Sequence, residues 1–145
     1  MSDSVSKADA ARLDKERFDR GLATRREVLG AAYVDKAVAS ADDFNLPLQE
    51  MVTRVAWDGI WNRPGLERRT RSMLNLAMLT ALNRPHEFKL HLVGALNNGV
   101  TREEIQEVLL QTVVYCGMPA AIDSFRVARD VFRERDDAAR NGNPT

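Results

Sequence analysis

The chain contains two histidines, His86 and His91, and both lie in one short stretch with Glu87. Glu87 precedes His91 by four residues, so on a helix the two side chains share a face. A carboxylate in that position can orient an imidazole and keep it ready for proton transfer. The same spacing is also typical of an ordinary surface ion pair. The pair is therefore the first candidate for acid–base chemistry, and the spacing alone leaves both interpretations open.

Four arginines gather around the start of a long apolar segment: Arg63, Arg68, Arg69 and Arg71. Positive charges at the N-terminus of a helix oppose the helix dipole. An anionic partner would stabilise such a cluster, and a bound carboxylate would supply one. A solvated first turn without a ligand would explain the cluster equally simply.

Several conspicuous residues have structural interpretations that are at least as good as functional ones. Trp57 and Trp61 lie one helical turn apart and are typical of core or interface aromatics, although they could also wall a pocket. Cys116 closes an apolar segment, which favours a packed small hydrophobe over a nucleophile. Glu104, three residues after Thr101, has the position of a capping-box glutamate.

Composition excludes several classes of protein. The 145 residues include 21 basic and 21 acidic residues, so no net charge attracts nucleic acid or an anionic membrane surface. A single cysteine excludes an intrachain disulfide and a CxxC redox or zinc motif. We expect no metal ion. We find neither a signal peptide nor a membrane-spanning apolar run, so a cytoplasmic location is expected.

Hydrophobic periodicity predicts an all-α fold of about six to seven helices, because apolar residues recur at three and four positions and never alternate. Gly30 is expected to end the first helix, Asp42 or Asp43 to cap the third, and Asn98 with Gly99 to end the fifth. The expected helices cover residues 4–29, 31–40, 48–60, 66–82, 85–98, 102–113 and 119–132. The fourth is apolar nearly all round, which predicts the most buried helix.

The domain organisation expected from the sequence is simple. Residues 1–17 carry a thin apolar stripe among many charges and suit a docked helical arm. Residues 18–135 form one helical domain with no internal repeat or linker, and residues 136–145 form a disordered tail.

Five groups of residues carry a resemblance to a known family: residues 44–45, 54–57 with 61–66, 69–72, 87–91 with 97–101, and 115–120. Together they resemble the 4-carboxymuconolactone decarboxylase family over about residues 18–132. The helical core with His91 followed by Gly99 and Val100 resembles the wider superfamily that includes the alkylhydroperoxidase D proteins. The block Trp57-x3-Trp61-x-Arg63-Pro64-Gly65-Leu66 is similar to the decarboxylases alone.

The resemblance itself argues against thiol peroxidase activity. The peroxidases use two cysteines, at positions that correspond here to Arg84 and Glu87, and a glutamate at a position that corresponds to Ser72. Without either thiol, dithiol chemistry cannot occur, and Cys116 has no resolving partner.

The resemblance implies cofactor-independent decarboxylation of 4-carboxymuconolactone to 3-oxoadipate enol-lactone, in the protocatechuate branch of aromatic catabolism. No cofactor is needed in principle, because the electrons left by carbon dioxide can enter the conjugated lactone carbonyl. The protein must then hold two carboxylates, stabilise the lactone oxygen and deliver one proton.

The family likeness suggests roles for eight residues. His91, oriented by Glu87, is expected to donate either the proton or a hydrogen bond to the lactone oxygen, and the sequence does not choose between them. Arginine forks bind carboxylates in a bidentate manner. The residues expected to bind the substrate are Arg71, with Arg63 or Arg84 as alternatives, then Ser72 as a donor, and Trp57 and Trp61 as walls.

A homo-oligomer, either a trimer or a hexamer with sites near subunit boundaries, is what the family resemblance implies. The small domain and its apolar helix point the same way. No nucleic acid or membrane partner is expected beside the small dicarboxylate substrate. Two further interpretations stay open: an enzyme acting on another lactone or keto acid, and a non-catalytic helical oligomeric binding protein.

Overall fold

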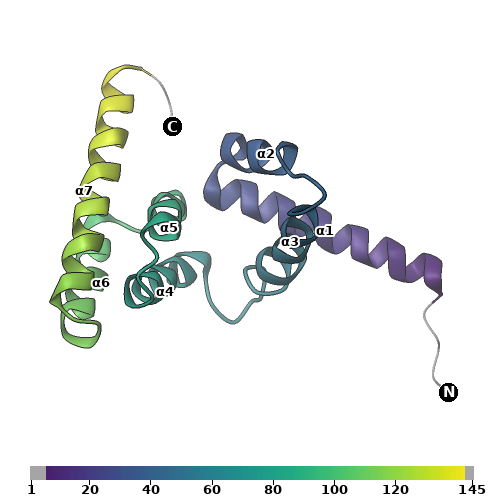
Figure 1. Cartoon of the computed structure of the whole chain (residues 1–145), viewed down its shortest axis with the longest axis horizontal. Coiled ribbons are helices and arrows are strands. Elements are labelled where there is room, and N and C mark those ends of the chain that lie inside the picture. The colour runs from purple at the N-terminus through teal and green to yellow at the C-terminus, as the bar shows by residue number, and fades with distance from the viewer. Residues whose placement is uncertain (1–5, 143–145) are drawn as a thin grey trace. The chain divides into compact units, whose positions relative to one another are not determined.

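A computed structural model describes residues 6–142 of the chain, and Figure 1 shows helices joined by turns over that range. The expected all-α class is confirmed, since no strand occurs among the described residues. The α-helices are α1 (Lys7–Leu29), α2 (Ala31–Ala39), α3 (Leu46–Met51), α4 (Arg68–Ala81), α5 (Pro85–Asn97), α6 (Arg102–Tyr115) and α7 (Met118–Arg140), and a π-helix, η1 (Val52–Asp58), follows α3. No helix within residues 6–142 is long and apolar enough to cross a membrane.

The chain divides into two compact units between Leu66 and Glu67, a division that no linker in the sequence indicates. In the first unit, Ser6 caps α1 by accepting a hydrogen bond from the backbone N–H of Asp9 at 3.1 Å. Gly30 ends α1 as expected, with a φ of 93° that a side chain would disfavour. The expected start near Ser4 lies outside the described residues.

The third helix differs from its prediction in both its cap and its hydrogen bonding. The carboxylate of Asp42 accepts the backbone N–H groups of Phe44 and Asn45 at 3.1 and 3.0 Å, so it stabilises the preceding turn, and Asn45 takes the N-cap position. Neither Asp42 nor Asp43 is the cap. The predicted continuous α-helix over residues 48–60 is also wrong, because residues Val52–Asp58 form a π-helix.

This π-helix packs closely against α1. A Cβ atom added to Gly21 of α1 would lie 2.1 Å from the carbonyl oxygen of Thr53, so the two backbones touch at this point. The hydroxyl of Thr53 donates to the carbonyl of Gln49 at 2.8 Å, four residues back. Neither this local side-chain bond nor the contact between two distant segments can be read from the periodicity of the sequence.

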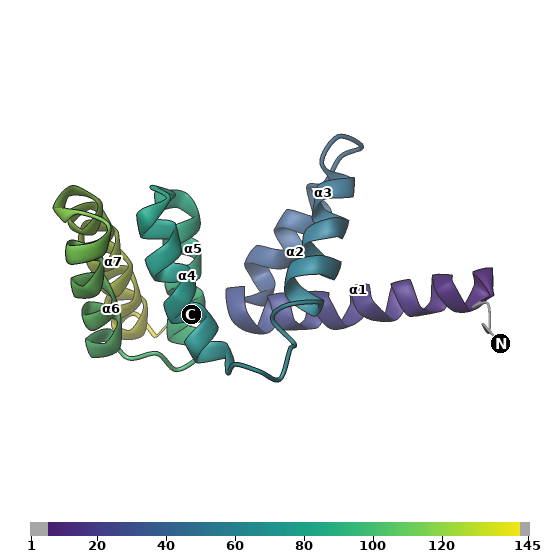
Figure 2. The ribbon, with the colours of Figure 1, turned by 90° about the horizontal axis from the view of Figure 1, so that it is seen from below.

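The second unit is built around α5. Phe88, Leu92 and Ala95 on this helix are fully buried, and they pack with Leu76 of α4 and with residues of α6 and α7. The helices form two neighbouring pairs, α4 with α5 and α6 with α7 (Figure 2). This arrangement makes α5 the centre of the core.

The prediction that the fourth helix is the most buried is wrong for the single chain. Leu74 and Met78 of α4 are 47% and 51% exposed, while Leu76 is fully buried. The apolar residues of α4 occupy two faces, and only one of them meets α5, α6 and α7 within the described chain. The other face is left for a partner or for solvent.

For the last two helices, the predicted start of α6 is confirmed and the predicted end of α7 is wrong. Thr101 and Glu104 form the expected capping box at the start of α6. The periodicity predicts an end of the last helix near Phe132, but α7 continues to Arg140. Its final turns carry charge rather than apolar periodicity, and they are tied to the core by the ion pair between Asp136 and Arg102. A helical segment that is held by ion pairs needs few apolar residues, so hydrophobic periodicity in the sequence does not detect it.

Both domain boundaries expected from the sequence fall inside helices. The boundary at residues 17 and 18 interrupts α1, and the boundary at residues 135 and 136 interrupts α7. The arm at residues 1–17 and the disordered tail at residues 136–145 stay sequence-based proposals. Residues 7–17 of the arm lie in α1 and residues 136–140 of the tail lie in α7, and residues 1–5 and 143–145 lie outside the described part.

Gly21→Ala tests the contact between α1 and the π-helix. The added methyl group meets backbone rather than a flexible side chain, so we expect the free energy of unfolding to fall by about 1–3 kcal/mol or more. Chemical denaturation followed by circular dichroism measures the loss. Gly65→Ala is the matched control, because nothing lies within 4 Å of its added Cβ. Equal stability of the two variants would contradict the close contact.

Candidate functional site

His91 lies in the middle of α5 and is half-buried, between the fully buried Phe88 and Leu92 of the same helix. Its Nδ1 atom is 3.3 Å from the side-chain nitrogen of Asn75 on α4. An amide NH2 group only donates hydrogen bonds, so Nδ1 must accept this one. The hydrogen of a neutral imidazole then resides on Nε2, which makes Nε2 the donor atom of the ring.

Burial lowers the pKa of His91 below its ordinary value of 6.5, and the negative charge of Glu87 raises it by a smaller effect. The imidazole is therefore neutral at neutral pH. A neutral ring with its hydrogen on Nε2 can donate a hydrogen bond to a developing oxyanion without carrying a positive charge.

Two predicted residues, Arg71 and Ser72, lie on α4, the helix whose Asn75 contacts this histidine. Arg71 is half-buried and precedes Asn75 by four residues, so it occupies the same face of α4 one turn away. Ser72 is buried and accepts a hydrogen bond of 2.9 Å from the side-chain nitrogen of Asn98, which follows the end of α5. This contact ties α4 to the end of α5 and favours a structural role for Ser72.

Glu87 and Arg84 belong to the exposed start of α5. Arg84 takes the N-cap position, Glu87 lies in the first turn, and His91 follows one turn later. The three residues are spaced by three and four positions and share a face of the helix. The second unit thus contains His91, Glu87 and Arg84 on or beside α5 and Arg71 and Ser72 on α4, and the hydrogen bond between Asn75 and His91 joins the two helices.

Arg69 is already paired within the chain. Its guanidinium lies 2.6 and 2.7 Å from the two carboxylate oxygens of Glu104. These hydrogen bonds hold the pKa of Glu104 below its usual range. The anionic partner expected for the arginine cluster is thus, for Arg69, a glutamate of the protein itself and not a ligand.

The remaining predicted residues lie in the first unit. The rings of Trp57 and Trp61 stack with centroids 5.0 Å apart and planes inclined by 22°, and both side chains are buried. Arg63 follows in an exposed turn. The two tryptophans therefore contact each other, and Arg63 follows them on the same segment.

Elsewhere in the second unit, a cavity of about 340 Å³ lies between α6 and α7. Its lining is mainly apolar and includes Ile105, Leu109 and Phe125, and none of the predicted site residues borders it. Within residues 6–142 no group of three or more His, Cys, Asp or Glu side chains is arranged to hold a metal ion.

Asn75 is the site residue that the sequence interpretation missed. Its only sequence signal is its polarity within the apolar run Met73-Leu74-Asn75-Leu76-Ala77. A polar side chain in such a run needs a hydrogen-bonding partner when the helix is packed. That partner, sixteen residues away, is visible only in the fold.

Residues 47–130 of the chain match the Carboxymuconolactone decarboxylase family. This range extends from α3 to most of α7 and so covers more than half of the sequence. It includes all eight residues that the sequence suggested for the site.

Three relatives are named decarboxylases. The chain is 40% identical to a 4-carboxymuconolactone decarboxylase from Acinetobacter baylyi, over 83% of this chain and 90% of the relative. It is 41% identical to a nitrosuccinic acid decarboxylase from Metarhizium robertsii, over 86% and 87% of the two chains. It is 49% identical to a 4-carboxymuconolactone decarboxylase from Pseudomonas putida, over 30% of this chain and 90% of that sequence.

Glu87→Gln tests the electrostatic link between Glu87 and His91. The carboxylate raises the pKa of His91, so its removal should lower that pKa further and move the titration to lower pH. Titration of the imidazole by NMR measures the shift. Glu107→Gln, on the exposed side of α6, is the control and should leave the titration of His91 unchanged. A pKa that stays constant or rises in Glu87→Gln would contradict the link.

Proposed function

This chain belongs to the carboxymuconolactone decarboxylase family, and on that basis we propose that it decarboxylates 4-carboxymuconolactone to 3-oxoadipate enol-lactone in protocatechuate catabolism. The observation that carries the proposal is the hydrogen bond that Nδ1 of His91 accepts from Asn75, which leaves the hydrogen of the neutral ring on Nε2; burial also lowers the pKa of this imidazole. Such a group suits a reaction that generates an oxyanion.

The chemistry of the substrate explains what the histidine does. When carbon dioxide leaves, its bonding electrons pass through the ring double bond to the lactone carbonyl oxygen. We propose that Nε2–H of His91 donates a hydrogen bond to that oxygen, which stabilises the charge as it develops. One proton then reaches the carbon α to the carbonyl, which completes the enol-lactone. No electron acceptor other than the substrate is required.

The second task is to hold the carboxylates. Arg71 is our first candidate, because it lies one turn from Asn75 and so on the side of α4 that meets His91. Arg84 is the alternative on α5, and Arg63 is the alternative from the first unit. A guanidinium binds a carboxylate through two parallel hydrogen bonds, which fixes its orientation as well as its charge. Glu87 tunes His91 through its charge.

A second substrate is favoured by the relative from Metarhizium robertsii, which is as similar as the lactone decarboxylase. Nitrosuccinic acid also carries two carboxylates, one of them on the carbon that bears an electron-withdrawing group. Its decarboxylation sends electrons into the oxygens of the nitro group, so the same oxyanion donor serves. We infer that the family site recognises a dicarboxylate with an adjacent electron sink, and we place the lactone first and nitrosuccinate second.

Thiol peroxidase activity receives less support from the residues of the chain. Cys116 is half-buried at the end of α6 and is the single cysteine, so a dithiol peroxidase lacks its second thiol. An enzyme acting on a different lactone or keto acid and a non-catalytic helical binding protein are the competing hypotheses. Independence of a cofactor and the cytoplasmic location also stay proposals.

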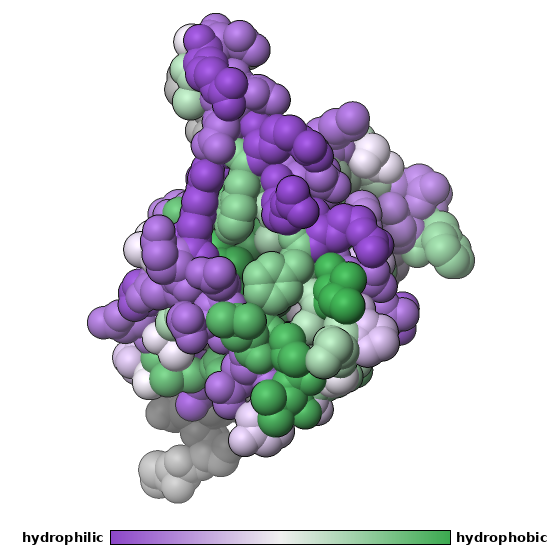
Figure 3. Space-filling model, turned by 90° about the vertical axis from the view of Figure 1, so that its left-hand side faces the viewer, coloured by the Kyte–Doolittle hydropathy of each residue, from purple (hydrophilic) through white to green (hydrophobic). Residues whose placement is uncertain are grey.

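We further propose that the protein is a homo-oligomer, a trimer or a hexamer. Val114 and Tyr115 at the end of α6 are 77% and 78% exposed, and Met118 at the start of α7 is exposed beside them. Figure 3 shows apolar residues gathered among charged ones over this side of the second unit. Apolar patches of this kind on a small chain are typical of subunit interfaces.

His91→Gln tests the proposed reaction. The substitution keeps size and polarity but removes the Nε2–H donor, so turnover of 4-carboxymuconolactone should fall by about 10²–10⁴-fold. Turnover is followed by the ultraviolet absorbance of the lactone and by released carbon dioxide, with nitrosuccinate assayed in parallel. His86→Gln, in the exposed first turn of the same helix, is the control. Near-normal turnover in His91→Gln excludes the role, and exclusive turnover of nitrosuccinate by the unaltered protein reverses the order of substrates.

Val114→Glu tests the assembly. A charge placed on the exposed apolar surface should weaken the oligomer and shift the mass measured by light scattering toward the 16.3 kDa of one chain. Ala139→Glu adds the same charge at an exposed position near the far end of α7, away from the patch, and should leave the mass unchanged. A fully active monomer of the unaltered protein would contradict the proposal.

A further inference from the structure

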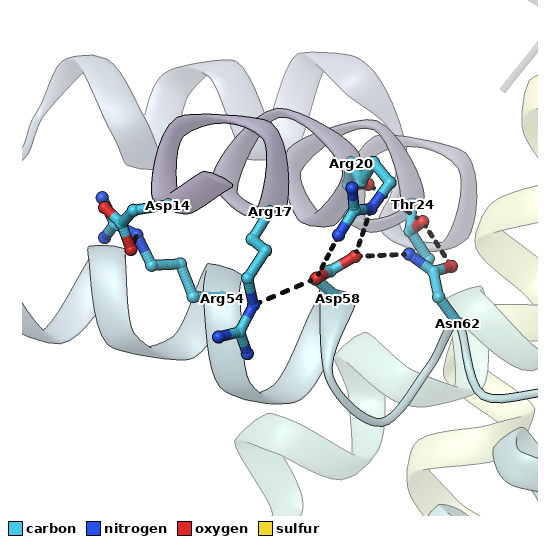
Figure 4. A network of polar contacts seen from close by, with 7 residues as sticks. All are labelled: Asp14, Arg17, Arg20, Thr24, Arg54, Asp58 and Asn62. Carbon is cyan, nitrogen blue, oxygen red and sulfur yellow. Dashed lines mark hydrogen bonds and ion pairs between the residues drawn. The ribbon is translucent and has the colours of Figure 1, made fainter. Parts of the chain in front are cut away.

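Asp58 is the centre of a polar network that joins α1 to the end of the π-helix (Figure 4). The side chain of Asp58 is only 8% exposed. Arg20 of α1 binds it through both carboxylate oxygens, with distances of 3.0 and 3.1 Å, and Nε of Arg17 lies 3.5 Å away. The hydrogen bonds from Arg20, ahead of those from Asn62 and Arg17, hold the pKa of Asp58 below its usual range.

Asn62 extends this network into the tryptophan block of the sequence. Its side-chain nitrogen donates to Asp58 at 3.4 Å, and its side-chain oxygen accepts from the hydroxyl of Thr24 at 2.8 Å. Figure 4 shows Arg17, Arg20 and Thr24 extending from α1 toward Asp58 and Asn62. The turn that contains Asp58 and Asn62 is thus attached to α1 at two points.

The backbone at this position is unusual and leaves little freedom. Asp58 is the last residue of the π-helix, and the N–H groups of Gly59 and Trp61 donate to carbonyls five residues earlier, at 3.0 and 2.9 Å. A Cβ at Gly59 would lie 2.5 Å from the carbonyl oxygen of Val55. Short π-helical segments are rare and occur frequently at functional sites.

The network and the stacked tryptophans occupy consecutive residues. Trp57 directly precedes Asp58, and Trp61 directly precedes Asn62, so any rotation of the turn displaces both rings. A buried carboxylate that has lost its partners costs far more than a surface ion pair gains. Arg17 and Arg20 are exposed, so the carboxylate of Asp58, whose side chain is 8% exposed, is the part of the network that depends most on its partners.

We propose that Asp58, held by Arg20 and Arg17, is a positioning residue that fixes the turn carrying Trp61 and Arg63 for binding of the substrate. The inference rests on the proposed decarboxylation, in which Arg63 of this segment is one of the alternatives for binding a substrate carboxylate. The proposal gives α1 a role in holding this turn, because Arg20 on α1 binds Asp58, which lies 38 positions away in the sequence.

Two variants test the proposal from opposite sides of the ion pair. Asp58→Asn removes the charge and keeps the shape, and Arg20→Gln removes the main donor, whose own side chain is exposed. Asp19→Asn is the matched control, because Asp19 pairs on the exposed side of α1 with Lys15, four residues away. Circular dichroism confirms that each variant is folded before it is assayed.

Two readouts separate positioning from general stability. The chain has two tryptophans and both lie in this segment, so their emission and its quenching by acrylamide report on the turn alone. We expect a red shift and greater quenching in Asp58→Asn and Arg20→Gln. The KM for the lactone should rise about ten-fold with a smaller change in kcat, because a misplaced binding group weakens the hold on substrate. The control should match the unaltered protein in both readouts.

The fluorescence and the kinetics decide separate parts of the proposal. Unchanged emission and quenching in folded Asp58→Asn overturns the positioning role, whether or not the protein acts on the lactone. Altered emission with an unchanged KM overturns the link to substrate binding. If the unaltered protein fails to decarboxylate either substrate, the proposed function falls by that result, and the fluorescence comparison still decides whether Asp58 and Arg20 hold the tryptophan segment.

Discussion

Burial of α5 is the constraint on which the second unit depends. Phe88, Leu92 and Ala95 form the centre of its core, and the helix periodicity that buries them also carries His91 into a half-buried position. A polar ring in such a place needs a partner, and Asn75 supplies it. Packing, the tautomer of the ring and its lowered pKa are consequences of the same helix placement.

The arginines of the chain illustrate how the fold assigns different tasks to chemically equal side chains. Arg69 is bound by the capping-box glutamate Glu104, and Arg20 is bound by the buried Asp58. Both serve the structure. Arg71, in contrast, lies one turn from the partner of the candidate catalytic histidine. A cluster of positive charge in the sequence is therefore a weak guide to ligand binding until the internal carboxylates are located.

The chemistry common to the decarboxylase relatives fits a small and simple site. Both named substrates carry two carboxylates and an electron sink beside the group that leaves. A protein acting on either needs one oxyanion donor and cationic groups for carboxylates, since the substrate accepts its own electrons. Differences between relatives can then arise from the shape of the pocket rather than from new chemical groups.

The sequence by itself determined the all-α class, the ends of the first and fifth helices at Gly30 and Gly99, and the capping box at Thr101, because these depend on residues close together in the chain. It also made His91 the first candidate for acid–base chemistry, because its rarity and its spacing from Glu87 can be seen in the sequence. Only the tertiary structure decided which helix is most buried, that Asn75 meets His91, and that Asp58 meets Arg20 across 38 positions. Hydrophobic periodicity records which faces are apolar, whereas the pairing of polar groups depends on which helices come together in space.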